Sequence, residues 1–456
     1  MCVQDIINRS KFGGILPRKT KIVIEKRGKT PFCLNQGANM SYPSKYVIQP
    51  SSLSGRVQVS GAKNSALKLL TASLLTSEKI EITNFPSTLL DAQVHVDMLE
   101  VLGKTCDTQG NKIVICERGP LSSKLEWDGR SIRNTLLILG ALVARTGKGA
   151  VPLPGGCNLG ERKFDLHEIV LKRLGADVWI DDNMLCAKAK GGLSGNDIVL
   201  PIRSTGATEN AIICASLADG MTTIWNPHIR PEILDLIRFL KSMGSQIEVF
   251  GQERIEVNGV PSLSGTKHSV IPDNMEAMTW LIASVITDGD LEIVDFPYQD
   301  LEVPLIYLRE SGAKYYQGTN SLIVRGGCPY PVEISTGPYP GINSDMQPLF
   351  AVYGACAQGQ SKIVDLRFPG RYGYSQELAK MGVDCKIDGN LLQINGGTSL
   401  KGANVKAVDL RAGVALTLAG LVAEGETKVM DAWQVERGYD NFVDKLTRVG
   451  GKIKYE

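Results

Sequence analysis

The sequence lacks the features that mark several classes of protein. Its 456 residues have a formal net charge of +2, only four histidines and 6% aromatic residues. The balanced charge gives no sign of a nucleic-acid or membrane surface, and four histidines disfavour a histidine-rich metal site. No apolar run reaches the length of a membrane span. The ten cysteines include no CxxC pair and no metal-like spacing. What remains is an ordinary globular composition, long enough for two or three domains.

The first 39 residues differ from the rest of the chain. They carry an excess of Lys and Arg over Asp and Glu, without the apolar core of a secretory signal. We therefore expect a cytoplasmic protein with reduced cysteines. Residues 1–39 are predicted to be a disordered extension or a wrongly assigned start, and neither carries function. The run Tyr46-Val-Ile-Gln, soon after Met40, predicts the first strand.

An internal repeat is the strongest pattern in the sequence. Six times, an apolar stretch is followed by a small polar turn and a β-rich run, as in residues 69–86, 212–227 and 281–297. Between these copies, a short amphipathic helix ends in glycine and leads into a strand hairpin. These glycines, 68 to 72 residues apart, are Gly103, Gly175, Gly244, Gly312, Gly382 and Gly450.

Each half of the repeat has a physical basis. Glycine ends a helix in the left-handed conformation without a Cβ penalty. Before Gly244, apolar residues recur at helical spacing from Ile233 to Met243, and after it residues 246–249 and 254–257 alternate as strands. The unit therefore predicts strand, helix, strand, helix and two strands. Six units form either an open array or two globular bodies of three. A scaffold without chemistry is the simpler interpretation, but the connecting loops concentrate unusual residues.

Two loops carry candidate reactive groups. Residues 60–66, Ser-Gly-Ala-Lys-Asn-Ser-Ala, form a glycine turn that opens a helix, so backbone N–H groups and Lys63 could bind an anion. The alternative is an exposed lysine in a first helical turn. In residues 153–162, Cys157 lies among glycines with Arg162 and Lys163 nearby, a setting that favours a reactive thiolate. The alternative is a small residue in a tight loop.

The remaining candidates are charged side chains. Asp345 precedes an apolar helix and is either an N-cap or a general base. His167 is expected to be structural. A set of arginines stands at helix starts and repeat junctions, and together they would suit carboxylate and phosphate groups, although each alone is commonly a solvated surface charge. They are Arg130, Arg133, Arg162, Arg371, Arg411 and Arg437.

At these residues the sequence resembles the UDP-N-acetylglucosamine 1-carboxyvinyltransferase family, enolpyruvyl transferases of peptidoglycan synthesis. The resemblance runs in order from about residue 45 to the end. It rests on SGAKN (60–64), LPGGC (153–157), DLH (165–167), STGATEN (204–210), SDMQ (344–347), DLRA (409–412) and ERGY (436–439). The related shikimate-pathway synthase shares the six-unit fold but has a different lysine motif.

The resemblance implies an α/β fold called the inside-out α/β prism, with two domains of three repeats each. Residues 40–63 plus 272–456 would form one domain and residues 64–271 the other, with the active site in the cleft between them. It implies phosphoenolpyruvate and UDP-N-acetylglucosamine as substrates. It implies no cofactor and no metal, and neither a nucleic acid, a membrane nor an obligate protein partner is expected.

Roles follow for individual residues by the same resemblance. Cys157 would donate a proton to phosphoenolpyruvate and can form an adduct with it, and Asp345 would lie beside the acceptor 3-hydroxyl. Lys63 and Arg437 would contact phosphoenolpyruvate. The other expected substrate contacts are Asn64, Arg133, Arg162, Asp165, Leu166, Ser204, Thr205, Gly206, Arg367, Arg371 and Arg411. The implied reaction is protonation of the methylene, attack by the hydroxyl on C2 and loss of phosphate.

Several positions depart from the family pattern around the acceptor. They are Lys163, Phe164, Arg367, Asn274 and the pair Asn343-Ser344. Two alternatives therefore stay open. One is a related enzyme that acts on another uridine nucleotide, for example in nucleoside-antibiotic synthesis. The other is a silent nucleotide-sugar binding protein, although such a binder has no reason to keep the proton donor.

Overall fold

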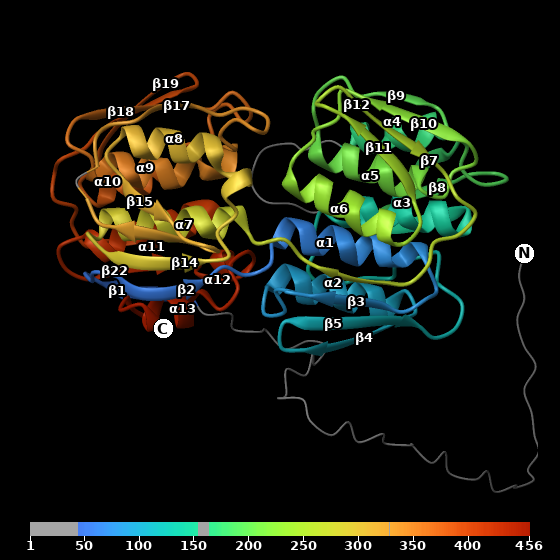
Figure 1. Ribbon diagram of the computed structural model, residues 1–456, viewed down its shortest axis with the longest axis horizontal. Helices are drawn as coiled ribbons and strands as arrows, with labels where there is room; N and C mark the ends of the chain where they lie inside the picture. Colours follow the sequence, from blue (N-terminus) through green and yellow to red (C-terminus); the bar gives the residue numbers. More distant parts are fainter. Residues whose placement is uncertain (1–43, 154–163, 328) are drawn as a thin grey trace, which may run out of the picture. The chain divides into compact units, whose positions relative to one another are not determined.

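The computed structural model describes residues 44–153, 164–327 and 329–456 as a mixed α/β protein (Figure 1). Over these residues the α-helices are α1 (Lys63–Ala72), α2 (Leu90–Val101), α3 (Thr135–Thr146), α4 (Asp165–Arg173), α5 (Thr205–Ala215), α6 (Pro231–Ser242), α7 (Asn274–Ile286), α8 (Glu302–Glu310), α9 (Gln347–Cys356), α10 (Gly373–Lys380), α11 (Leu410–Val422), α12 (Trp433–Glu436) and α13 (Phe442–Arg448). Short 3-10 turns are η1 (Ser73–Leu75), η2 (Tyr298–Asp300) and η3 (Ser344–Met346).

The strands are short and follow the helices in a recurring order. They are β1 (Lys45–Gln49), β2 (Ser54–Gln58), β3 (Ile80–Thr83), β4 (Lys104–Gln109), β5 (Lys112–Glu117), β6 (Lys148–Pro152), β7 (Asp177–Asp181), β8 (Met184–Lys188), β9 (Asp197–Val199), β10 (Met221–Trp225), β11 (Gln246–Phe250), β12 (Arg254–Asn258), β13 (Thr266–Ser269), β14 (Asp290–Val294), β15 (Lys314–Gln317), β16 (Ser321–Arg325), β17 (Glu333–Ser335), β18 (Gln360–Val364), β19 (Asp384–Asp388), β20 (Leu391–Asn395), β21 (Asn404–Lys406), β22 (Thr427–Met430) and β23 (Lys452–Tyr455). The predicted first strand at Tyr46 is confirmed as β1.

One pairing scheme recurs among the sheets formed by the described residues. In the sheet β11-β12-β10-β9, β9 pairs parallel with β10, while β10 and β11 both pair antiparallel with β12. The sheets β15-β16-β14-β2 and β17-β18-β20-β19 combine one parallel and two antiparallel pairs in the same way. Between Asp197 and Asn258 the chain runs β9-α5-β10-α6-β11-β12, which is the predicted order of elements.

The helices fall into two kinds, and burial separates them. In α7 every residue from Asn274 to Val285 is buried, and the same holds for Ala207–Ala215 of α5 and Gln347–Ala355 of α9. A helix that is buried on all sides is a core element. By contrast, α6 is amphipathic: Ile233, Leu236, Ile237 and Leu240 are buried, with Arg238 and Lys241 turned outward.

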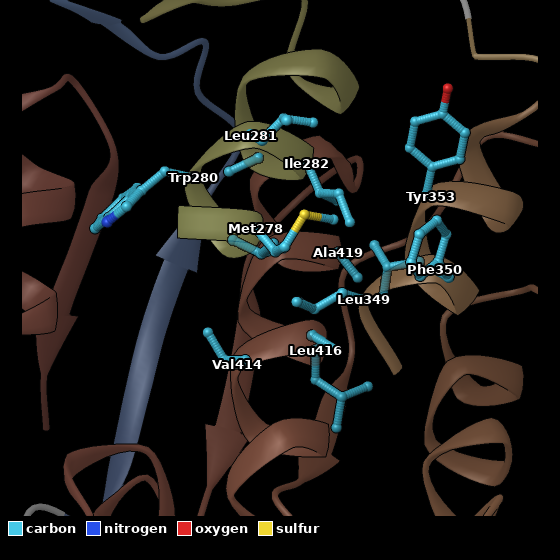
Figure 2. Close-up of a cluster of buried hydrophobic side chains, with 14 of the residues drawn as sticks. Met278, Trp280, Leu281, Ile282, Leu349, Phe350, Tyr353, Val414, Leu416 and Ala419 are labelled. Carbon is cyan, nitrogen blue, oxygen red and sulfur yellow. The ribbon is translucent and has the colours of Figure 1, made fainter. Parts of the chain in front are cut away.

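The buried side chains gather in two separate clusters. One contains side chains from Tyr46 to Val59 and from Met275 to Ile453, and the other runs from Ala62 to Val270. In the first, Met278 and Ile282 of α7 lie near Leu349 and Phe350 of α9 and Ala419 of α11 (Figure 2). Trp280, Met278, Phe350 and Leu416 are among the side chains drawn there, and all are fully buried. The chain therefore buries two cores, with the change from one to the other at α1 and again before α7.

The six predicted glycine caps are confirmed by the backbone. Gly103, Gly175, Gly244, Gly312, Gly382 and Gly450 all have φ between 88° and 106°. An L side chain rarely adopts such angles, so these positions require glycine. Among the described residues, no helix is both long and apolar enough to cross a membrane.

Candidate active site

A cavity of about 950 Å³ brings together most of the residues that the sequence singled out. Its walls are built largely from helix starts and the loops before them. The predicted residues that line it are Asn64, Arg133, Asp165, Leu166, Ser204, Thr205, Gly206, Asp345 and Arg367. The volume lies within the range of small-molecule and cofactor pockets.

Two helix N-termini lie in the wall of this cavity. Asp165 and Leu166 are the first residues of α4, and Thr205 and Gly206 begin α5. Ser204 caps α5 by accepting a hydrogen bond from the Ala207 N–H at 3.4 Å. A helix start offers unpaired N–H groups and the positive end of the dipole, so this part of the wall suits phosphate.

Two histidines in the cavity wall are neutral. Burial, with a smaller effect from neighbouring cations, lowers the pKa of His167 to about 3 and that of His228 to about 4. His228 Nε2 accepts a hydrogen bond from the Tyr339 N–H at 3.4 Å, and its Nδ1 lies 2.9 Å from Thr205 Oγ1. His228 therefore ties the start of α5 to the loop around Tyr339. His167 is buried, as expected for a structural residue.

Asp345 lines the cavity and faces arginines. Its Oδ1 accepts a hydrogen bond from Arg371 Nη1 at 2.7 Å, and its Oδ2 accepts one from Arg411 Nε at 3.4 Å. Burial alone would raise the pKa of Asp345, but the two guanidinium groups outweigh it and hold that pKa far below its usual range. The N-cap interpretation is wrong, because the cap of η3 is Asn343, which accepts from the Asp345 N–H at 3.0 Å.

The arginines are themselves held in place by carboxylates. Asp409 caps α11 by accepting from the Arg411 and Ala412 N–H groups at 2.8 Å, and its other oxygen lies 3.3 Å from Arg371 Nη2. Asp365 is completely buried and accepts from the Arg367 N–H at 2.8 Å. These contacts hold the start of α11, which carries Arg411, and the loop between β18 and α10, which carries Arg371.

Lys63 and Arg437 both form ion pairs with the carboxylate of Asp91. Lys63 Nζ is 2.6 Å from Asp91 Oδ2, and Arg437 Nε donates to Asp91 Oδ1 at 3.1 Å. Lys63 begins α1, as predicted, but its backbone N–H donates to Asp273 Oδ2 at 3.1 Å. The first backbone donor of this helix is therefore occupied by a carboxylate, which leaves the ammonium group as the candidate anion-binding feature of the loop.

These contacts link the predicted residues into two adjoining groups. Asn64, Asp345 and the helix starts line the cavity. Arg371 and Arg411 contact Asp345, and Lys63 and Arg437 contact Asp91. Asp345 joins the groups through Arg371 and Arg411, and the charge of Arg411 also acts on Lys63. Cys157, Arg162 and Lys163 lie outside the described residues.

The cavity also contains charges that the sequence did not reveal. Arg230 forms a two-point ion pair with Glu232, at 2.6 and 2.7 Å, and its charge acts on Asp345. Burial raises the pKa of Glu209 to about 7, although the charge of Lys68 lowers it in part. Lys68 Nζ lies 3.5 Å from Glu209 Oε2. Arg367 is exposed and stacks on Phe368, and within the described part of the chain no carboxylate lies within ion-pair distance of it.

One signal could have found Asp91. It lies on the buried face of α2, with His95 and Met98 at helical spacing, and a carboxylate at a core position requires a buried partner. Arg230 gave no comparable signal, because its place depends on the fold around the cavity.

Comparison with known proteins identifies the family. The family model of EPSP synthase (3-phosphoshikimate 1-carboxyvinyltransferase) matches residues 47–446. The chain belongs to this family. Within it, a UDP-N-acetylglucosamine 1-carboxyvinyltransferase of Caldanaerobacter subterraneus is 38% identical over 413 residues, which cover 90% of this chain and 99% of that protein. One of Azorhizobium caulinodans is 39% identical over 421 residues, 90% and 98% of the two chains.

Solved structures of the family share the fold. The enolpyruvyl transferase NikO of Streptomyces tendae matches with a TM-score of 0.82 at 26% identity, covering 90% of this chain and 99% of its own. An EPSP synthase of Acinetobacter baumannii matches with a TM-score of 0.69 at 17% identity, covering 91% and 100%. The mixed α/β architecture is therefore the enolpyruvyl transferase fold.

Proposed function

We propose that the protein transfers the enolpyruvyl group of phosphoenolpyruvate to the 3-hydroxyl of UDP-N-acetylglucosamine, with release of phosphate, as the first committed step of peptidoglycan synthesis. The observation that carries this proposal is that a cavity lined by helix starts adjoins cations held by Asp345 and Asp91. Lys63, Arg371, Arg411 and Arg437 can balance the carboxylate and phosphate of phosphoenolpyruvate, since guanidinium binds both in a two-point manner.

The names of the near full-length relatives support the same substrates. The start of α5 is suited to the diphosphate of a nucleotide sugar. Asn64, Arg133, Asp165, Leu166 and the Ser204–Gly206 turn are proposed to contact the acceptor, together with Arg162 and Arg367. Two domains, 40–63 plus 272–456 and 64–271, are proposed to form the six-unit prism. The two separate cores and the recurring sheet pairing support that division.

The proposed chemistry is addition followed by elimination. Cys157 gives its proton to the methylene carbon, which leaves C2 cationic, and the acceptor oxygen forms a bond to C2. The hydroxyl proton then passes to Asp345. The Cys157 thiolate then takes back a proton from the new methyl group as the C2–O bond to phosphate breaks, which restores the double bond, and the proton held by Asp345 leaves with the phosphate. Positioned acid and base groups typically contribute about 10²- to 10⁴-fold each.

The contacts of Asp345 indicate when its proton moves. A carboxylate held by Arg371 and Arg411 is a weak base, because its pKa is far below its usual range. It can orient a neutral hydroxyl by accepting its hydrogen bond. Once the oxygen has bonded to the cationic C2, the proton becomes strongly acidic, and even a weak base removes it. Proton transfer is therefore expected to follow attack.

A second acceptor has one observation in its favour. Arg367 lines the cavity as an exposed cation, and the structurally similar NikO is an enolpyruvyl transferase named separately from the relatives above. The positive charge of Arg367 favours an acceptor that places negative charge beside it, such as the phosphate of a nucleoside monophosphate. A silent nucleotide-sugar binder is the remaining alternative, and it predicts binding without turnover.

The test is phosphate release from phosphoenolpyruvate with a panel of acceptors. UDP-N-acetylglucosamine, uridine monophosphate and shikimate 3-phosphate are compared at equal concentration, each with an Arg367→Val control. We expect the nucleotide sugar to give the fastest release. A preference for the monophosphate that Arg367→Val abolishes would replace the proposed acceptor. Binding of the nucleotide sugar without any release of phosphate would favour the silent nucleotide-sugar binder.

A further inference from the structure

We infer that Asp91 is the positioning residue that keeps Lys63 charged and fixes Arg437 beside it for anion binding. Asp91 stands in α2, Lys63 begins α1, and Arg437 follows α12, so one carboxylate joins three parts of the chain. Arg437 contacts both of its oxygens, with Nε donating to Oδ1 at 3.1 Å and Nη2 donating to Oδ2 at 3.3 Å, and Lys63 Nζ lies 2.6 Å from the same Oδ2.

Burial makes this arrangement necessary. Exposed fractions are only 10% for the Lys63 side chain and 5% for that of Asp91. A charged amine that leaves water loses its proton readily unless an opposite charge stabilises it. Asp91 supplies that charge at hydrogen-bond distance, whereas the cations around Lys63 act against it.

The charged groups that face Lys63 come from four elements. They are Asp91 of α2, Arg437 after α12, Arg411 of α11 and Asp273, the cap of α7. Burial lowers the pKa of Lys63, Asp91 raises it, and Arg437 and Arg411 lower it. Asp273 is occupied by the Lys63 and Met275 N–H groups. Asp91 is thus the neighbouring carboxylate that contacts the ammonium group itself.

Removal of this charge should therefore have a pH-dependent effect. In Asp91→Asn the pKa of Lys63 falls further, so the ammonium group loses its proton at a lower pH than in the wild type. Anion binding at Lys63 is lost as pH rises through that pKa. The defect is consequently largest at high pH and shrinks as pH falls, and a purely structural role would not produce this dependence.

The Lys104–Glu117 pair offers a matched control. Glu117 Oε2 lies 2.8 Å from the buried Lys104 Nζ, and Oε1 lies 3.5 Å from an arginine, Arg145. This carboxylate therefore also holds one lysine and one arginine, but none of the three lines the cavity. Glu117→Gln removes a comparable charge and is expected to leave Lys63 unchanged.

The direct test follows the Lys63 titration by NMR in protein carrying ¹³C-labelled lysine side chains, with the signal assigned through Lys63→Met. Asp91→Asn should move the Lys63 midpoint to lower pH, and Glu117→Gln should not move it. Arg437→Gln should move it to higher pH, because a repelling cation is removed, and this variant leaves the Lys63–Asp91 pair intact if Asp91→Asn fails to fold. Asp91→Glu should return the midpoint toward that of the wild type.

A second measurement, the KM for phosphoenolpyruvate, rests on the proposed function, whereas the Lys63 titration needs no substrate. With phosphoenolpyruvate, Asp91→Asn should raise KM about 10- to 100-fold at pH 8, the range expected for a lost charge-assisted contact, and less at pH 6. An unchanged Lys63 midpoint in Asp91→Asn would overturn the inference. A lower KM would do so too, since Asp91 would then be a placeholder that substrate displaces. Absence of turnover with a shifted midpoint would instead contradict only the proposed function.

Discussion

Replacement of Asp345 by asparagine should destabilise the protein as well as stop the reaction. Removing a charge from an active site is often neutral or stabilising, because such sites hold strained and repelling groups. Here the surroundings reverse that expectation. Asp345 contacts Arg371 and Arg411, and the charge of Arg230 also acts on it, so its loss removes a carboxylate that interacts with three cations.

The magnitude follows from the individual contacts. The 2.7 Å bond to Arg371 Nη1 is charge-assisted, and such bonds contribute about 1.5–3 kcal/mol. The 3.4 Å contact to Arg411 Nε is long and adds little. Arg371 keeps Asp409 at 3.3 Å, and Asp345 is 30% exposed, so solvent screens part of the effect. We therefore expect a loss of about 2 kcal/mol, within the range of that single bond.

Urea unfolding at neutral pH measures this difference, with thermal unfolding as a second probe. A loss of about 2 kcal/mol lowers the melting temperature of a core of this size by roughly 4–8 °C. Transfer activity should fall by at least about 10²-fold, as expected when a positioned acid–base group is removed. If the Asp345→Asn variant is as stable as the wild type, or more so, the reasoning from the three arginines is refuted.

The pH dependence provides an independent check. The pKa of Asp345 in the folded protein lies below its unfolded value, because the arginines outweigh burial. Its contribution is therefore complete above an unfolded pKa of about 3.9 and is lost as pH falls toward the folded value. The stability difference between wild type and variant should stay constant from pH 5 to pH 8 and shrink below pH 4.

Two further predictions concern the loop and the core. Cys157→Ala should lose transfer while still binding the nucleotide sugar by calorimetry, whereas full turnover would remove Cys157 from the mechanism. Gly140→Ala places a Cβ 2.0 Å from Asn210 Oδ1 and 2.9 Å from Cys214 Sγ. Overpacking between α3 and α5 should cost about 1–3 kcal/mol, more than the helix gains from alanine. Urea unfolding measures it, and a variant more stable than the wild type would contradict the close packing.

Much of the architecture could be predicted from the sequence because it depends on local rules. The six glycines end helices at positive φ, and the spacing from Ile233 to Met243 marks one buried face. The alternation at 246–249 and 254–257 is confirmed by the pairing of β11 with β12. The number of repeats per domain and the prism arrangement do not follow from such rules and stay predictions.

The site could be predicted less completely, because its contacts join distant segments. The motifs pointed to Lys63 and Asp345, but neither motif indicates that Asp91 holds Lys63 or that Arg371 holds Asp345. These partners lie 28 and 26 residues from the residues they hold. Asp345 was left open between cap and base, and the structure excludes the cap because Asn343 performs that role. Arg230 was missed entirely.

The most direct test of the account is phosphate release from phosphoenolpyruvate in the presence of UDP-N-acetylglucosamine, followed by mass spectrometry of the nucleotide product. The cations at Asp345 and Asp91 and the helix starts of the cavity predict one phosphate per enolpyruvyl group gained by the sugar, and no release without acceptor. Release that needs a different acceptor would contradict the assigned substrate. Tight binding of the nucleotide sugar without any phosphate would contradict the transferase assignment itself.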